Sequence, residues 1–160
     1  MNRLALILSL PFLLAVTANA APTIFIVRHA EKASTGGNDP DLSPQGKKRA
    51  DALAQILKDS QITSVFVTEL KRTQETAAPT AKAAQVTPTV IPANDIGPLV
   101  EKLRALSGNA LVVGHGNTIP EVLKALGIAT AVSVPEDDYN EIFVVMAGDT
   151  SQLLRLHYPF

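Results

Sequence analysis

Four short runs of apolar and β-branched residues divide the chain, and they constrain its fold more than any other feature. The runs are TIFIV at 23–27, ITSVFV at 62–67, ALVVG at 110–114 and IFVVMA at 142–147. Strands that are apolar almost throughout are typical of a largely parallel sheet covered on both faces. A weaker candidate, VTPTVI at 86–91, contains Pro88 and is therefore expected at the edge of the sheet.

Helical patterns separate these runs. Ser43 and Pro44 are typical of an N-cap and a first helical turn, and an apolar face follows as far as Leu57. Further helices are predicted at 72–84, where Pro79 is expected to cause a kink, at 96–106, and at 119–126, where Gly127 ends the pattern. The segment 152–158 is expected to pair with 142–147 as a hairpin. This alternation predicts one α/β domain with a mostly parallel central sheet and an antiparallel C-terminal hairpin.

The first twenty residues have a different character. Arg3 precedes an apolar run at 4–16, and the small residues at 18–20 suit cleavage before Ala21. This layout predicts a signal peptide at 1–20, followed by a single domain at 21–160. We therefore expect a periplasmic or secreted protein with no membrane attachment after cleavage. The apolar run is shorter than the roughly 20 residues of a membrane span, and an uncleaved anchor is the alternative.

Composition excludes several classes of function. The formal net charge of −1 gives no broad basic surface for nucleic acid, and aromatic residues, at 4%, are too few for a nucleobase-stacking platform. The chain has no cysteine, which excludes disulfides, thiolate zinc sites and cysteine nucleophiles. Nothing in the sequence indicates an oligomeric state.

Charged and imidazole side chains follow the predicted strands at the points where the strands end. Arg28 and His29 follow the first run, Arg72 comes shortly after the second, and His115 follows Gly114 at the end of the third. Ligands of open α/β sheets bind outside the carboxyl ends of the strands, so these side chains are expected to meet in one pocket. Two guanidiniums match the oxygens of a tetrahedral dianion, and a helix that starts near Thr118 is expected to add backbone donors.

A neutral imidazole in such a pocket is a competent nucleophile, so the sequence predicts phosphoryl transfer without a metal. Other motifs fit poorly: Gly116 stands where a hydrolase elbow has serine, Ile119 stands where a dinucleotide fingerprint has its third glycine, and no phosphate loop is present. A metal site at His29, Glu31 and His115 is disfavoured by the adjacent arginines.

Three motifs, VRHAEK, ELKRTQETA and VVGHGNT, together with DLSPQGKKRADALA between the first two, resemble the histidine phosphatase superfamily in its phosphoglycerate-mutase-like branch. The resemblance implies a three-layer α/β/α fold and no cofactor. It also implies that His29 is the phospho-accepting nucleophile, and that Arg28, Arg72 and His115 complete the phosphate pocket. Two substrate contacts are further implied, at Glu31, which matches the acidic residue of the family's R-H-G-E form with Ala30 in place of glycine, and at Asn117.

The family's proton donor is a glutamate after the third strand, a position that this chain does not match closely. Asp95 is the favoured candidate, and Glu121, which is also expected to contact the substrate, is the alternative. The segment 31–42 is small and polar, and is expected to form a mobile rim that contacts the leaving group.

The sequence thus predicts an exported phosphatase that hydrolyses phosphate monoesters through a phosphohistidine. A phosphoglycerate-type mutase and a non-catalytic binding module for phosphate esters are the alternatives. Phosphosugars of the cell envelope, small metabolites and phosphoprotein side chains are all compatible substrates.

Overall fold

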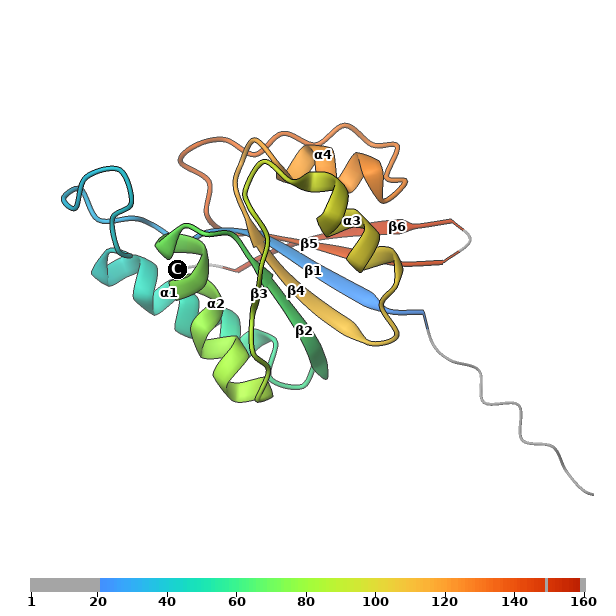
Figure 1. The fold of residues 1–160 in the computed structure, drawn as a ribbon, viewed down its shortest axis with the longest axis horizontal. Coiled ribbons are helices and arrows are strands. Elements are labelled where there is room, and N and C mark those ends of the chain that lie inside the picture. The colour runs from blue at the N-terminus through green and yellow to red at the C-terminus, as the bar shows by residue number, and fades with distance from the viewer. Residues whose placement is uncertain (1–20, 149, 159–160) are drawn as a thin grey trace, which may run out of the picture.

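The computed structural model describes residues 21–148 and 150–158, so the predicted signal peptide lies outside the described residues. In this part of the chain, a central sheet lies between helices (Figure 1). The elements, in order, are β1 Thr23–Arg28, α1 Pro44–Ile56, β2 Ile62–Val67, α2 Lys71–Ala84, β3 Thr89–Val90, α3 Ile96–Arg104, β4 Asn109–Gly114, α4 Ile119–Ala125, β5 Glu141–Met146 and β6 Gln152–His157.

The strand order is β3-β2-β4-β1-β5-β6. β3, β2, β4 and β1 are parallel, β5 is antiparallel to β1, and β6 is antiparallel to β5. The prediction of a mostly parallel α/β sheet with an antiparallel C-terminal hairpin is confirmed. Because β2, β4 and β1 are neighbours, the chain segments that leave their carboxyl ends emerge side by side.

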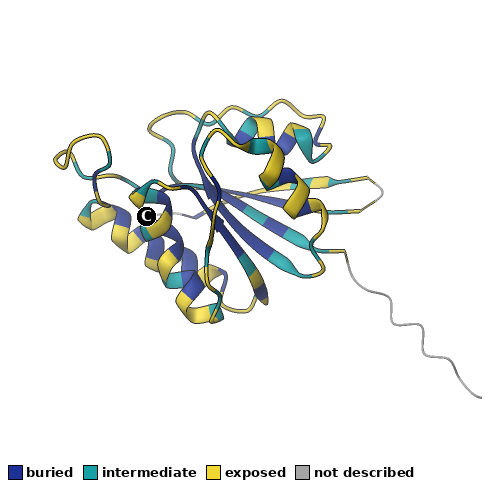
Figure 2. Ribbon diagram, viewed as in Figure 1, coloured by how far each residue is buried: buried dark blue, intermediate teal, exposed yellow. Residues whose placement is uncertain are grey.

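Helices cover both faces of the sheet, which gives the predicted three layers (Figure 1). On one face α1 and α2 pack Leu53 and Ala77 against the sheet, and on the other α3 and α4 pack Leu103 and Val122. The outer faces of the helices are exposed, while the middle strands are mainly buried (Figure 2). This burial of apolar surface stabilises the strand ends on which the site is built.

Local differences from the predictions are small. β3 lies at the sheet edge as predicted but has only two residues, because Pro88 has no N–H to donate to a ladder. α2 continues through Pro79 to Ala84. α3 ends at Arg104, two residues before the predicted end. Within the described ranges, no helix has the length and hydropathy of a membrane span.

Candidate active site

The register of two parallel strands brings both histidines of the predicted pocket to one edge of the sheet. Arg28 at the end of β1 pairs with Gly114 at the end of β4, and the backbone N–H of His29 donates to the Gly114 carbonyl at 2.9 Å. His29 and His115 therefore leave adjacent strands, with their ring centroids 5.4 Å apart. Both side chains are largely buried, at 5% and 7% exposed.

His29 is oriented by its own backbone. Its Nδ1 lies 2.8 Å from the carbonyl oxygen of Ala30. A carbonyl only accepts hydrogen bonds, so Nδ1 carries the proton and Nε2 keeps its lone pair. Ala30 is itself fixed, because it is fully buried and its N–H donates to Thr76 Oγ1 at 2.9 Å. The unprotonated nitrogen is the atom that a nucleophile requires.

Both imidazoles are neutral at pH 7. Burial is the largest cause that lowers the pKa of His29 to about 4; the Ala30 carbonyl opposes it, and His115 and the arginines 28 and 72 add to it. Burial also leads in lowering the pKa of His115 to about 4, with Arg72 and Arg28 adding to the effect and Glu69 opposing it. The positive charge of the site therefore comes from the guanidiniums and Lys32, and not from the imidazoles.

Arg28 faces the same space from the end of β1. Its Nη1 donates to the Pro135 carbonyl at 2.7 Å, and its guanidinium lies 4.4 Å from the ring centre of Tyr139. The Nε atoms of Arg28 and Arg72 are buried and have no hydrogen-bond partner within the described residues. An unpaired buried donor costs about 1–3 kcal/mol, which the oxygens of a bound phosphate would offset.

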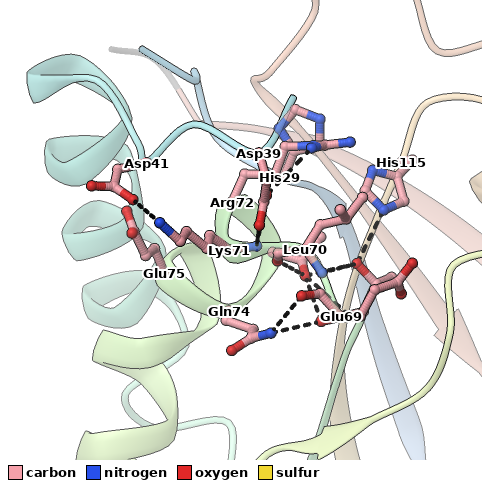
Figure 3. Close-up of polar contacts among 12 residues, drawn as sticks. His29, Asp39, Asp41, Glu69, Leu70, Lys71, Arg72, Gln74, Glu75 and His115 are labelled. Atoms are coloured by element: carbon pink, nitrogen blue, oxygen red, sulfur yellow. Dashed lines mark hydrogen bonds and ion pairs between the residues drawn. The ribbon is translucent and has the colours of Figure 1, made fainter. Parts of the chain in front are cut away.

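Arg72 stands in the first turn of α2, and the loop after β1 holds that turn (Figure 3). The Asp39 carboxylate accepts from the backbone N–H of Lys71 at 3.0 Å and lies 3.8 Å from Arg72 Nη1. Lys71 Nζ in turn contacts Asp41 at 3.2 Å. The segment 31–42 was predicted as a mobile rim, but these contacts fasten it to α2, and Lys32 is its one residue in the lining of the cavity described next.

A cavity of about 630 Å³ opens at this edge of the sheet. The predicted pocket residues all line it, and further polar side chains join them from other loops. Its polar lining comprises Arg28, His29, Lys32, Arg72, Asn94, His115, Asn117, Thr118, Ser133, Glu136 and Tyr139. The structure therefore brings together Arg28, His29, Arg72, His115 and Asn117, as the strand ends predicted.

Glu31 is not part of this lining, contrary to its prediction as a substrate contact. Its carboxylate receives two hydrogen bonds from Arg49 Nε, at 2.9 and 3.0 Å, and a third from Nη2 at 2.6 Å. Burial alone would raise the pKa of Glu31, but the hydrogen bonds from Arg49 lower it below its usual value. Arg49 is 6% exposed, so Glu31 forms a partly buried ion pair that ties the loop after His29 to α1.

The two predicted proton donors also lie outside the cavity lining. Asp95 precedes α3 and lines a narrower, mainly apolar pocket next to the cavity. Glu121 is exposed in the first turn of α4. The structure therefore does not bring either carboxylate into the lining beside His29, where an acid that protonates the leaving group is expected.

The start of α4 also differs from its prediction as a source of phosphate-binding donors. The backbone N–H groups of Thr118 and Ile119 both donate to the carbonyl of His115, at 3.1 and 3.0 Å. These donors fix the turn after His115 and are not directed at a ligand.

Residues 24–94 match the model of the histidine phosphatase superfamily, branch 1. The resemblance of the sequence to the histidine phosphatase superfamily is confirmed over these residues. No curated protein matches it by sequence.

Solved structures of the superfamily share the fold. The protein histidine phosphatase SixA, solved with tungstate, has a TM-score of 0.71 at 20% identity, covering 84% of this chain and 96% of that one. A mycobacterial glucosyl-3-phosphoglycerate phosphatase, solved with VO3, has a TM-score of 0.68 at 16% identity, with 87% and 100% covered. Mycobacterial hydrolase 1 has a TM-score of 0.67 at 15% identity, with 88% and 100% covered.

The motifs identified in the sequence did not predict that the segment before β5 lines the cavity. Val132, Ser133, Val134, Glu136 and Tyr139 from this segment line the cavity. It has no helical or strand periodicity, so pattern analysis treats it as a plain connection. The available signal was compositional, because three consecutive acidic residues stand next to one of only two tyrosines in the chain.

The chemistry of this cavity favours an anion over a metal ion. The described residues contain no cluster of three or more histidine, aspartate or glutamate side chains that could hold a metal. Two guanidiniums and Lys32 line the cavity against a single carboxylate, that of Glu136. Fixed positive charge with directed N–H groups suits a phosphoryl group.

Proposed function

We propose that the protein is an exported phosphatase that hydrolyses phosphate monoesters through a phosphohistidine at His29, without a metal. The observation that carries the proposal is the state of His29, whose Nε2 keeps its lone pair beside two arginines in one cavity. The match of residues 24–94 to the histidine phosphatase superfamily model supports the reaction class.

In the proposed reaction, Arg28, Arg72 and His115 hold the oxygens of the phosphoryl group while His29 Nε2 attacks phosphorus. The N–P bond forms as the bond to the leaving oxygen breaks, and that oxygen takes up a proton. Water then attacks the phosphohistidine and releases inorganic phosphate. Preorganised donors of this kind are each worth about 3 kcal/mol in the transition state, judged from the loss of single oxyanion donors.

The substrate is proposed to be a small phosphate ester or a phosphorylated side chain. A cavity of about 630 Å³ exceeds the volume of a phosphate, so a leaving group the size of a sugar fits beside it. The similar structures of a protein histidine phosphatase and of a glucosyl-3-phosphoglycerate phosphatase support both kinds of substrate.

Export rests on the pattern of residues 1–20, with its apolar run and small residues before Ala21. Expression of the full chain in a bacterium, followed by fractionation and N-terminal sequencing, tests it. We expect periplasmic protein that begins at Ala21, and intact chain in the membrane fraction would overturn export by cleavage.

The catalytic proposal is tested with His29→Asn, with His157→Asn on exposed β6 as the matched control. We expect His29→Asn to lose turnover of p-nitrophenyl phosphate and acid-labile phosphoenzyme labelling, and the control to keep both. Wild-type activity should persist in a chelator. If wild-type protein binds phosphate esters without turnover, the protein is a binding module. If it transfers phosphate between hydroxyls, it is a mutase.

A further inference from the structure

We propose that Glu136 is the catalytic acid that protonates the leaving group and then the base that activates water. The inference rests on the proposed function, because it concerns the same cavity. Among the described residues that line the cavity, Glu136 is the one with a carboxylate side chain. A monoester with a poor leaving group needs a proton at the departing oxygen, and a carboxyl group in the same cavity is suited to supply it.

The segment that carries Glu136 is fastened to the phosphate pocket on both sides of that residue. Before it, the Pro135 carbonyl accepts from Arg28 Nη1 at 2.7 Å. After it, the Asp138 carbonyl accepts from the same nitrogen at 3.4 Å, and the Tyr139 ring lies against the Arg28 guanidinium. Glu136 thus lies exposed in a turn whose two ends are held by one arginine.

A second contact holds this segment from the side of His115. A β-carbon at Gly116 would lie 3.1 Å from the Val134 carbonyl oxygen, so the two backbones approach closely at a residue without a side chain. The turn after His115 and the segment before β5 therefore pack directly together. These contacts fix the position of Glu136 relative to Arg28 and to the turn after His115.

Other carboxylates near the site are engaged elsewhere. Glu31 is paired with Arg49, and Asp39 accepts from the N–H of Lys71. Glu69 accepts from the backbone N–H of Ala93 at 2.9 Å and is not in the cavity lining. These contacts leave Glu136 as the carboxylate placed to meet a leaving group.

The His29 Nε2–P bond forms while the P–O bond to the leaving group breaks, and the proton of the Glu136 carboxyl moves to the departing oxygen. In the second half, the Glu136 carboxylate takes a proton from water as the water oxygen bonds to phosphorus and the Nε2–P bond breaks. The products are an alcohol and inorganic phosphate, and both side chains return to their initial states.

Glu136→Gln is the decisive variant, assayed with glycerol phosphate as a poor leaving group and p-nitrophenyl phosphate as a good one. We expect kcat/KM for glycerol phosphate to fall about 10²–10³-fold, and that for p-nitrophenyl phosphate to fall far less, because a good leaving group needs no proton. The phosphoenzyme should also accumulate with p-nitrophenyl phosphate, since hydrolysis loses its base. Asp137→Asn is the matched control, because it removes the same charge from the same turn outside the lining.

The outcome is read together with the variant at His29. His29→Asn is expected to abolish turnover. If Glu136→Gln then lowers kcat/KM equally for the two substrates, or leaves kcat/KM unchanged for both, the assignment of Glu136 fails and the proposed function stands. A leaving-group-dependent loss in Glu69→Gln, Asp95→Asn or Glu121→Gln instead would also overturn it. If His29→Asn retains turnover, the proposed function itself fails.

Discussion

The two sides of the cavity are built in different ways. The strand side, defined here as Arg28, His29, Arg72 and His115, is positioned by the ends of β1 and β4 and the first turn of α2. The loop side, defined as residues 132–139, contains no regular element and meets the strand side mainly through Arg28. In the proposed mechanism, strand ends and the first turn of α2 position the groups that bind any phosphoryl group, and an irregular segment presents Glu136 to the leaving group.

The largest expected effect is a loss of kcat/KM whose dependence on the substrate distinguishes the strand side from the loop side. Arg72→Ala should lower kcat/KM about 10²–10³-fold for glycerol phosphate and p-nitrophenyl phosphate alike, because Arg72 meets oxygens that all substrates share. Arg28→Ala should show this common loss together with an additional loss for glycerol phosphate, since Arg28 also holds the loop side. Steady-state kinetics with both substrates measures the difference.

Lys47→Ala, at an exposed position of α1, is the control and should retain wild-type kinetics. If Arg72→Ala discriminated between the two substrates as strongly as Arg28→Ala, the division into two sides would be wrong.

A smaller effect concerns the pH dependence of stability, and it belongs to the strand side. The pKa of His29 falls from 6.5 to about 4 on folding. The unfolded chain therefore binds the proton first as pH falls, so the contribution to stability is fully present above 6.5 and is lost as pH falls to about 4. The slope should approach 1.4 kcal/mol per pH unit for each such histidine.

Urea unfolding of wild type and of His29→Gln between pH 7 and pH 4 measures this contribution. The wild type should lose more stability than the variant over this range, because the variant lacks the shifted imidazole of His29 and keeps only that of His115. Parallel curves for the two proteins would contradict the neutral, buried state of His29.

The smallest effect belongs to the loop side. Tyr139→Leu removes the ring against Arg28 and should cost about 0.5–1 kcal/mol, or a few-fold in kcat/KM. Tyr139→Phe keeps the ring and should behave as wild type. Kinetics with p-nitrophenyl phosphate distinguish them, and equal losses in both variants would assign the role to the hydroxyl instead of the ring.

The strand side was predictable because its positions follow from rules of chain geometry. Apolar runs locate parallel strands, parallel strands share a carboxyl edge, and whatever follows each run must meet there. His29 and His115 come together for this reason although 86 positions separate them. The edge position of β3 followed in the same way from Pro88.

The loop side and the carboxylates were not predictable by such rules. The contact between Arg28 and Pro135 uses a backbone carbonyl, which every residue has, so no residue type reveals it. The partner of Glu31 was hidden for a related reason, since Arg49 reads in the sequence as one more polar residue of an amphipathic helix. Asp95 was chosen by its place in the chain, but the start of α3 directs it to the neighbouring apolar pocket.

The hydrogen bond from His29 to the carbonyl of the next residue has a consequence for mutational tolerance. When a carboxylate side chain holds an imidazole, a single substitution of that side chain removes the hydrogen bond that fixes the reactive tautomer. Here the acceptor is the peptide unit itself, so no replacement of a neighbouring side chain deletes it. The choice of the attacking nitrogen is therefore inherited from the path of the main chain, and this part of the site tolerates sequence drift for as long as the fold persists.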